Sequence, residues 1–160
     1  MNDEDKDLKQ PQWEKVYRSL DEAKNRLDEA STEEQFQAVG IICRETLISL
    51  AQIVYDPVEH PSERIIPSKT DAKKMLDAFL SNKLSGHTNE AARHQAKATL
   101  DLANDLQHKR TAGYRDAALC VEATTSVVNT VTLLSGHTPR LSSFDVQVKF
   151  SHKGITLGRL

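Results

Sequence analysis

The sequence predicts an all-α protein, an antiparallel bundle of about five helices followed by a short C-terminal β-hairpin or extended tail. Apolar residues recur at helical spacing in five separate segments. Aromatic residues make up only 5% of the chain, whereas alanine, leucine, glutamate and lysine are frequent. At 160 residues the chain is long enough for one domain with a substantial core, and too short for two.

The first helix is predicted to begin near Gln12. Residues 1–11 are highly charged and end at Pro11, so we expect them to form a flexible N-terminal arm. Residues 12–136 are the predicted helical domain. An apolar stripe marks the first helix within it and comprises Trp13, Val16, Tyr17, Leu20, Ala23 and Leu27.

A long second helix is predicted to follow Ser31-Thr32-Glu33-Glu34, which offers an N-cap hydroxyl and carboxylates in the first turn. Its apolar pattern is wide and reaches Val54. Arg44 and Glu45 interrupt that pattern. They form either a solvated stripe or two groups directed at a polar site, and the sequence leaves both interpretations open.

Three prolines between residues 56 and 70 predict a loop, because proline lacks an amide donor and restricts the residue before it. Ser68-Lys69-Thr70-Asp71 then predicts the cap of a shorter third helix that ends near Ser85-Gly86. Thr88-Asn89-Glu90 predicts the start of a fourth, alanine-rich helix that continues through Leu106.

The fifth segment, residues 114–134, is apolar nearly all round and is therefore predicted to be a buried helix. Its many threonines and valines would also suit a strand, but its length and its lack of strict alternation favour a helix. Residues 137–160 form a C-terminal extension. Alternating apolar residues over 144–150 and again at Ile155 and Leu157 predict the hairpin there.

The end of the fourth helix is the strongest candidate for a functional site. Asn104 and His108 are four residues apart, so on a helix they lie on one face, about one turn from each other. Lys109 and Arg110 add positive charge directly after them. A histidine in the last turn of a helix also complements the helix dipole, so simple capping is the alternative interpretation.

Composition narrows the functional classes. The net charge of −2 argues against non-specific binding to a polyanion. Cys43 and Cys120 fall within apolar patterns and are predicted to be reduced core residues, and the six histidines are too scattered to predict a metal site or a cofactor. The N-terminus lacks an apolar signal region and no run of 18 apolar residues occurs, so we expect a cytoplasmic protein without membrane association.

Several of these features together resemble the HEPN superfamily, over roughly residues 12–136. They are the internal Arg44-Glu45 pair of the second helix, the Asn104-x-x-x-His108 end of the penultimate helix, a short loop with a threonine, and a final apolar helix. The resemblance implies a bundle of four or five helices, frequently dimeric, whose catalytic members are metal-independent ribonucleases of toxin-antitoxin, phage-defence and RNA-processing systems.

The catalytic motif of that superfamily is an arginine, four to six residues and a histidine, commonly with a polar residue directly after the arginine. Asn104 matches the polar residue and His108 matches the histidine, but Ala103 stands where the arginine is expected. Metal-free RNA cleavage needs a proton acceptor and a cation for the charge that develops on the phosphate. His108 would supply the first, and Arg44, Lys109, Arg110 or a partner subunit the second.

The sequence therefore predicts a non-catalytic HEPN-like binding or regulatory module, homodimeric, in a bacterial defence or toxin-antitoxin type system. Its expected partners are RNA or a nucleotide and a protein encoded nearby. The predicted ligand site comprises Arg44, Glu45, Asn104, His108 and Arg110. Two alternatives stay open: a metal-independent endoribonuclease with His108 and Asn104 as catalytic residues, and a purely structural helical interaction protein.

Overall fold

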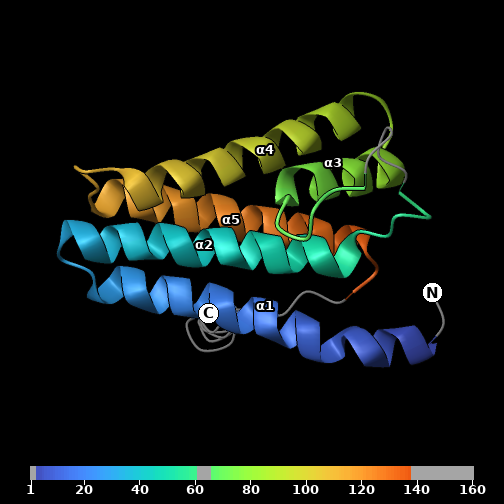
Figure 1. Cartoon of the computed structure of the whole chain (residues 1–160), viewed down its shortest axis with the longest axis horizontal. Helices are drawn as coiled ribbons and strands as arrows, with labels where there is room; N and C mark the ends of the chain where they lie inside the picture. Colours follow the sequence, from blue (N-terminus) through green and yellow to red (C-terminus); the bar gives the residue numbers. More distant parts are fainter. Residues whose placement is uncertain (1–2, 61–65, 138–160) are drawn as a thin grey trace, which may run out of the picture.

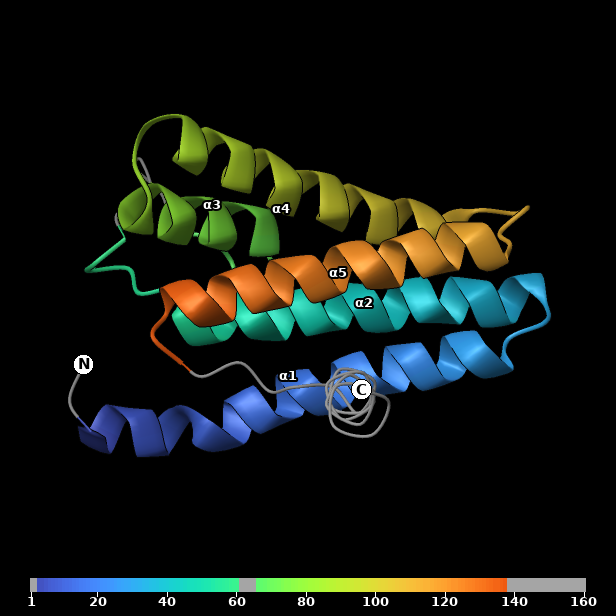
Figure 2. The same cartoon turned by 180° about the vertical axis from the view of Figure 1, so that it is seen from behind.

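The computed structural model describes residues 3–60 and 66–137, and within them the chain forms a bundle of five helices. The helices are α1 (Asp3–Glu29), α2 (Glu33–Val54), α3 (Ala72–Lys83), α4 (Gly86–His108) and α5 (Tyr114–Leu134). Helix α2 contacts all four others, and the shorter α3 packs against α4 and α2 (Figures 1 and 2). This confirms the predicted all-α bundle. The predicted hairpin over 144–157 lies outside the described residues.

Local capping fixes where α2 and α3 begin. The Thr32 side chain accepts a hydrogen bond from the Gln35 amide, and the Gln35 carboxamide oxygen accepts one from the Thr32 amide, both at 3.2 Å. This capping box satisfies two donors that the helix itself leaves free. Asp71 likewise accepts from the Lys74 amide at 3.2 Å. Helix α4 starts at Gly86 (φ +59°), slightly before the predicted Thr88.

Helix α1 begins at Asp3 rather than near Gln12, so residues 3–11 are helical where we predicted a flexible arm. Pro11 is exposed within the helix and does not end it. A contact between distant parts of the chain supports this first stretch, because the Lys9 ammonium donates to the carbonyl of Ile53 on α2 at 3.2 Å. Charge composition gave no indication of that contact.

Two clusters of buried side chains form the core. The larger one occupies the end of the bundle that contains α3. It draws on the middle of α1, the second halves of α2 and α5, the buried face of α3, and Ala96 and Leu100 of α4. The smaller one, at the opposite end, is built mainly from small residues on α1, α2, α4 and α5, such as Ala23, Cys43, Ala103 and Ala117. Small side chains let these helices approach closely.

Buried threonines are accommodated by bonding back to the preceding helical turn. In α5, Thr124 donates to the Cys120 carbonyl at 2.8 Å and Thr132 donates to the Val128 carbonyl at 2.6 Å. A buried hydroxyl without a partner would be costly, and this arrangement removes that cost. The prediction of a helix over 114–134 is confirmed, despite its β-branched residues. The prediction that it is buried holds for one face only, because Tyr114, Leu119 and Leu133 are exposed.

Cys43 and Cys120 are free and fully buried, as predicted. Their hydrogen bond to each other, together with burial, raises the pKa of Cys120. Helices α2 and α5 are long and apolar enough to cross a membrane by length and composition, a test that core helices of soluble proteins also pass. Here both contribute side chains to the two core clusters.

Candidate functional site

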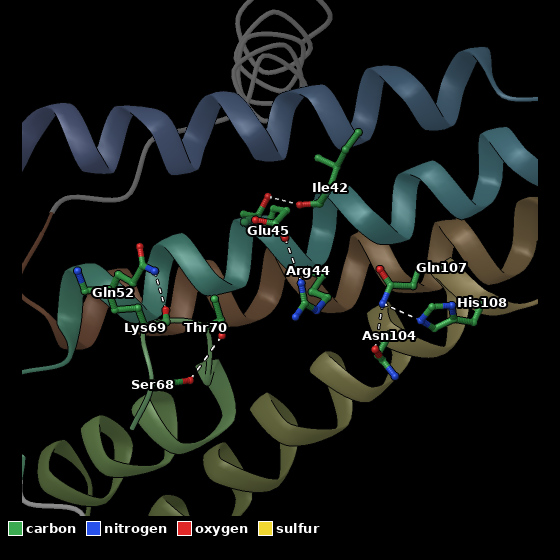
Figure 3. Close-up of polar contacts among 11 residues, drawn as sticks. Ile42, Arg44, Glu45, Gln52, Ser68, Lys69, Thr70, Asn104, Gln107 and His108 are labelled. Carbon is green, nitrogen blue, oxygen red and sulfur yellow. Dashed lines mark hydrogen bonds and ion pairs between the residues drawn. The ribbon is translucent and has the colours of Figure 1, made fainter. Parts of the chain in front are cut away.

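A pocket of about 440 Å³ opens between α2, the start of α3 and α4, and we call it the α2–α3–α4 pocket. Arg44 of α2 and Asn104 of α4, two of the predicted site residues, both line it. Figure 3 shows these two side chains on their helices. The remaining lining residues are Ile48, Ser68, Thr70, Asp71, Ala72, Lys73, Leu100 and Asp101. Residues far apart in the sequence therefore meet at one polar opening.

Arg44 is half-buried, and its guanidinium extends from α2 toward α4 (Figure 3). It donates to the carboxylate of Glu45 at 3.1 Å. Glu45 is exposed and does not line the pocket. Because a guanidinium has five donors in a fixed plane, this single hydrogen bond leaves most of the donors of Arg44 available to a ligand.

Gln107 joins Asn104 to His108 at the end of α4. Its carboxamide nitrogen donates to the side-chain oxygen of Asn104 at 3.0 Å and lies 3.2 Å from Nε2 of His108 (Figure 3). If Gln107 donates there, Nε2 of His108 is an acceptor and its proton resides on Nδ1. His108 is exposed and lies outside the pocket lining. Arg110 is also exposed, in the loop after α4, and does not line the pocket either.

His108 lies in the last turn of α4, where a basic side chain complements the helix dipole, so the capping interpretation stays open. Lys109 is the C-cap of α4, and its carbonyl accepts a hydrogen bond from the Gln37 side chain of α2 at 2.8 Å. The carbonyl at this helix end is thus satisfied from a neighbouring helix.

Ala103, at the position where the superfamily motif has arginine, is fully buried in the smaller core cluster. It lies against Gly40 of α2, where a Cβ atom would come within 3.0 Å of the Ala103 carbonyl oxygen. A side chain at position 103 is therefore directed into the contact between α2 and α4. Arg44 lines the pocket from α2, the helix opposite Ala103.

The segment before α3 supplies site residues that the sequence did not predict. Gln52 of α2 donates to the Lys69 carbonyl at 2.6 Å, which holds this segment against α2 (Figure 3). Ser68 and Thr70 thereby line the pocket. Their sequence signal indicated a helix cap, and nothing local showed that this cap would lie opposite Asn104.

An ion pair spans α3 and α4 at the pocket, between Lys73 and Asp101. The Asp71 carboxylate accepts from the Lys74 amide. Both acidic side chains of the lining are therefore already engaged. The other polar groups of the lining are the Arg44 guanidinium, the Asn104 amide and the hydroxyls of Ser68 and Thr70, which lie 3.5 Å from each other. Over residues 3–60 and 66–137, no three His, Cys, Asp or Glu side chains are placed to hold a metal ion.

No family model, curated protein or solved structure matches this chain.

Proposed function

We propose that the protein is a non-catalytic, HEPN-like binding and regulatory module whose ligand site is the α2–α3–α4 pocket. The observation that supports this most directly is that Arg44 and Asn104, on separate helices, line one pocket. His108 stands outside that lining, so the pocket combines ligand-binding groups without the proposed proton acceptor. The geometry therefore favours binding over cleavage.

The proposed ligand is a phosphate-bearing one, RNA or a nucleotide. Arginine forms two parallel hydrogen bonds with phosphate oxygens, and amide and hydroxyl donors complete such sites. Arg44, Asn104, Ser68 and Thr70 provide these groups within one pocket. A volume of about 440 Å³ is within the range of small-ligand sites, and suits one nucleotide.

We further propose that the protein is cytoplasmic and acts as a homodimer in a bacterial defence or toxin-antitoxin type system, with a protein partner encoded nearby. Exposed apolar side chains on α5 support a protein contact: Tyr114, Leu119 and Leu133 are each more than half exposed. Exposed apolar side chains are typical of an association surface where they form a contiguous patch. Sedimentation of the full chain tests the dimer.

A binding experiment tests the ligand site. Fluorescently labelled single-stranded RNA and a labelled nucleotide are titrated with the wild-type protein and with Arg44→Gln and Asn104→Ala. We expect each substitution to weaken binding by about tenfold, the effect of losing one charge-assisted hydrogen bond. Arg26→Gln is the matched control, because Arg26 pairs with Glu22 on the exposed side of α1. Equal binding by all four proteins would refute the site.

The endoribonuclease remains the second candidate, because Gln107 links Asn104 and His108. Incubation of structured RNA with the protein in EDTA distinguishes the two functions. Cleavage that disappears in His108→Ala would overturn the non-catalytic proposal. His94→Ala, an exposed histidine earlier on α4, is the control for this variant.

A further inference from the structure

A second cavity, of about 260 Å³, is lined by the C-terminal half of α3, whereas the α2–α3–α4 pocket is lined by its first residues. We call it the His60 cavity. It is formed by the first half of α1, the end of α2, α3 and the residues that follow α5. Its walls include Lys9, Trp13, His60, Phe79, Lys83 and His137. It shares no lining residue with the α2–α3–α4 pocket, so it is a separate feature of the bundle.

His60 presents an unsatisfied polar group in this cavity. Its side chain is only 3% exposed, and its ring packs edge-on against Phe79 with 5.5 Å between the ring centroids. Nδ1 accepts a hydrogen bond from the Asp56 amide at 3.0 Å. Nε2 is buried and has no hydrogen-bond partner among the described residues. Buried polar groups are nearly always paired, so a hydrogen-bond partner is expected at this atom.

The tautomer of His60 defines what that ligand must offer. Because Nδ1 accepts from a backbone amide, it cannot hold a proton, and the neutral ring must hold its proton on Nε2. Nε2 is therefore a donor that requires an acceptor oxygen. A ligand that could only donate, such as an amine, would leave the group unsatisfied.

We propose that the His60 cavity binds a small organic carboxylate with a planar apolar body, its carboxylate accepting from Nε2 of His60. Two lysines, Lys9 and Lys83, line the same cavity and favour an anionic acceptor over a neutral one. Of the two acidic lining residues, Asp56 already accepts from the Val58 amide at 2.8 Å and Glu59 is exposed.

Aromatic surfaces in the cavity walls suit the planar body. Trp13 and His137 lie nearly parallel, with ring centroids 4.6 Å apart and an angle of 5° between the planes. The rings of Phe79 and His60 pack edge-on, and the Lys83 ammonium is 6.0 Å from the centroid of the Phe79 ring. Flat apolar groups pack well against such rings. A volume of about 260 Å³ limits the ligand to roughly one aromatic ring with a short acidic arm.

The test uses the full chain with ¹⁵N-labelled histidine and three matched probes: phenylacetate, phenylacetamide and phenethylamine. We expect phenylacetate to move the Nε2 resonance of His60 and to raise Tm. Phenylacetamide, which has an acceptor but no charge, is expected to bind at least about fivefold more weakly, and phenethylamine not at all. Binding of the amine as tightly as the carboxylate would overturn the proposal.

Substitutions locate the site. Lys83→Gln changes an exposed side chain, so folding is preserved, and it is expected to weaken phenylacetate binding about fivefold. His60→Gln is expected to abolish binding, and its circular dichroism reports whether it folds. His94→Gln, remote from the cavity on α4, is expected to bind as the wild type does. An unchanged His60 resonance at ~10 mM phenylacetate, or unchanged affinity in Lys83→Gln, would refute the site.

Discussion

Gly40 and Ala103 bring the backbones of α2 and α4 into direct contact. A Cβ atom built on Gly40 would lie 3.0 Å from the carbonyl oxygen of Ala103 and 3.0 Å from the backbone nitrogen of Gln107. Backbone atoms of a helix cannot move aside as the end of a flexible side chain can. This contact therefore sets the distance between the two helices that bear Arg44 and Asn104.

Gly40→Ala is expected to destabilise the protein by about 1–2 kcal/mol, because overpacking outweighs the better helix propensity of alanine. Urea denaturation followed by circular dichroism measures the change. Gly113→Ala is the comparison variant, since the nearest atom to a Cβ there is 4.0 Å away. Because Gly113 is the N-cap of α5, where alanine is a poorer cap, it is expected to cost about 0.5 kcal/mol, less than Gly40→Ala. A Gly40→Ala protein as stable as the wild type would show that the helices can separate at little cost.

Placing an arginine at position 103, as in the HEPN motif, is not expected to create an active site. Ala103→Arg would place a guanidinium in a fully buried position against Gly40, at a cost of about 3–5 kcal/mol. Such a loss is a large part of the roughly 5–15 kcal/mol that keeps an ordinary domain folded. Circular dichroism and gel filtration measure it, with Asp105→Arg on the exposed side of α4 as the control. A folded Ala103→Arg protein that cleaves RNA would contradict this account.

Asp77 of α3 links two cations of α4. Arg93 donates to both oxygens of Asp77, at 2.7 and 3.2 Å, and Lys97 lies 3.3 Å from it. Burial opposes ionisation of Asp77, but the hydrogen bonds and charges of Arg93 and Lys97 outweigh burial and lower its pKa. This attachment of α3 to α4 therefore depends on an ionised carboxylate.

Asp77→Asn is expected to cost about 1 kcal/mol at pH 7, because both partners stay half-exposed. A carboxylate with a lowered folded-state pKa stabilises the fold above its unfolded pKa, and the contribution is lost as pH falls through the folded value. The difference between wild type and Asp77→Asn should therefore shrink below about pH 4. Urea titrations at pH 7 and pH 3 measure it, and a difference that does not change with pH would contradict the ionised pair.

His60 and His137 should make the fold sensitive to mild acid. Burial lowers the pKa of both histidines, with nearby charges making smaller contributions. The unfolded chain therefore binds protons first as pH falls below about 6.5, and stability decreases from there toward the folded pKa. We expect a lower Tm at pH 5.5 than at pH 7.5. His60→Gln should reduce this dependence, whereas the exposed His94→Gln should not.

Local signals explain why most helix boundaries could be predicted. Thr32 and Asp71 cap their helices through hydrogen bonds to residues three positions away, which a sequence shows directly. The predicted start of α1 was wrong because charge density and Pro11 suggested disorder. In the structure, Lys9 donates a hydrogen bond to the carbonyl of Ile53, far along the chain. A contact between residues so far apart in the sequence leaves no local sequence pattern from which it could be predicted.

The residues of the two candidate sites also differ in whether a local sequence signal or a long-range contact places them there. Arg44 and Asn104 could be proposed because each is unusual within its own helix, and the structure places both at one pocket. Ser68 and Thr70 join them only because Gln52 holds the segment before α3. His60 lies in a proline-containing loop, where a sequence predicts exposure, and its burial arises from packing against Phe79.

The stack between Trp13 and His137 joins the first helix to the residues directly after the last one. It closes a longer stretch of chain than a contact between neighbouring helices does, and long closures are slow relative to helix formation. Trp13 is also the only tryptophan of the chain. In refolding, its fluorescence should therefore change after the helical signal of circular dichroism. The fluorescence change would then measure the rate at which α1 packs against the residues that follow α5.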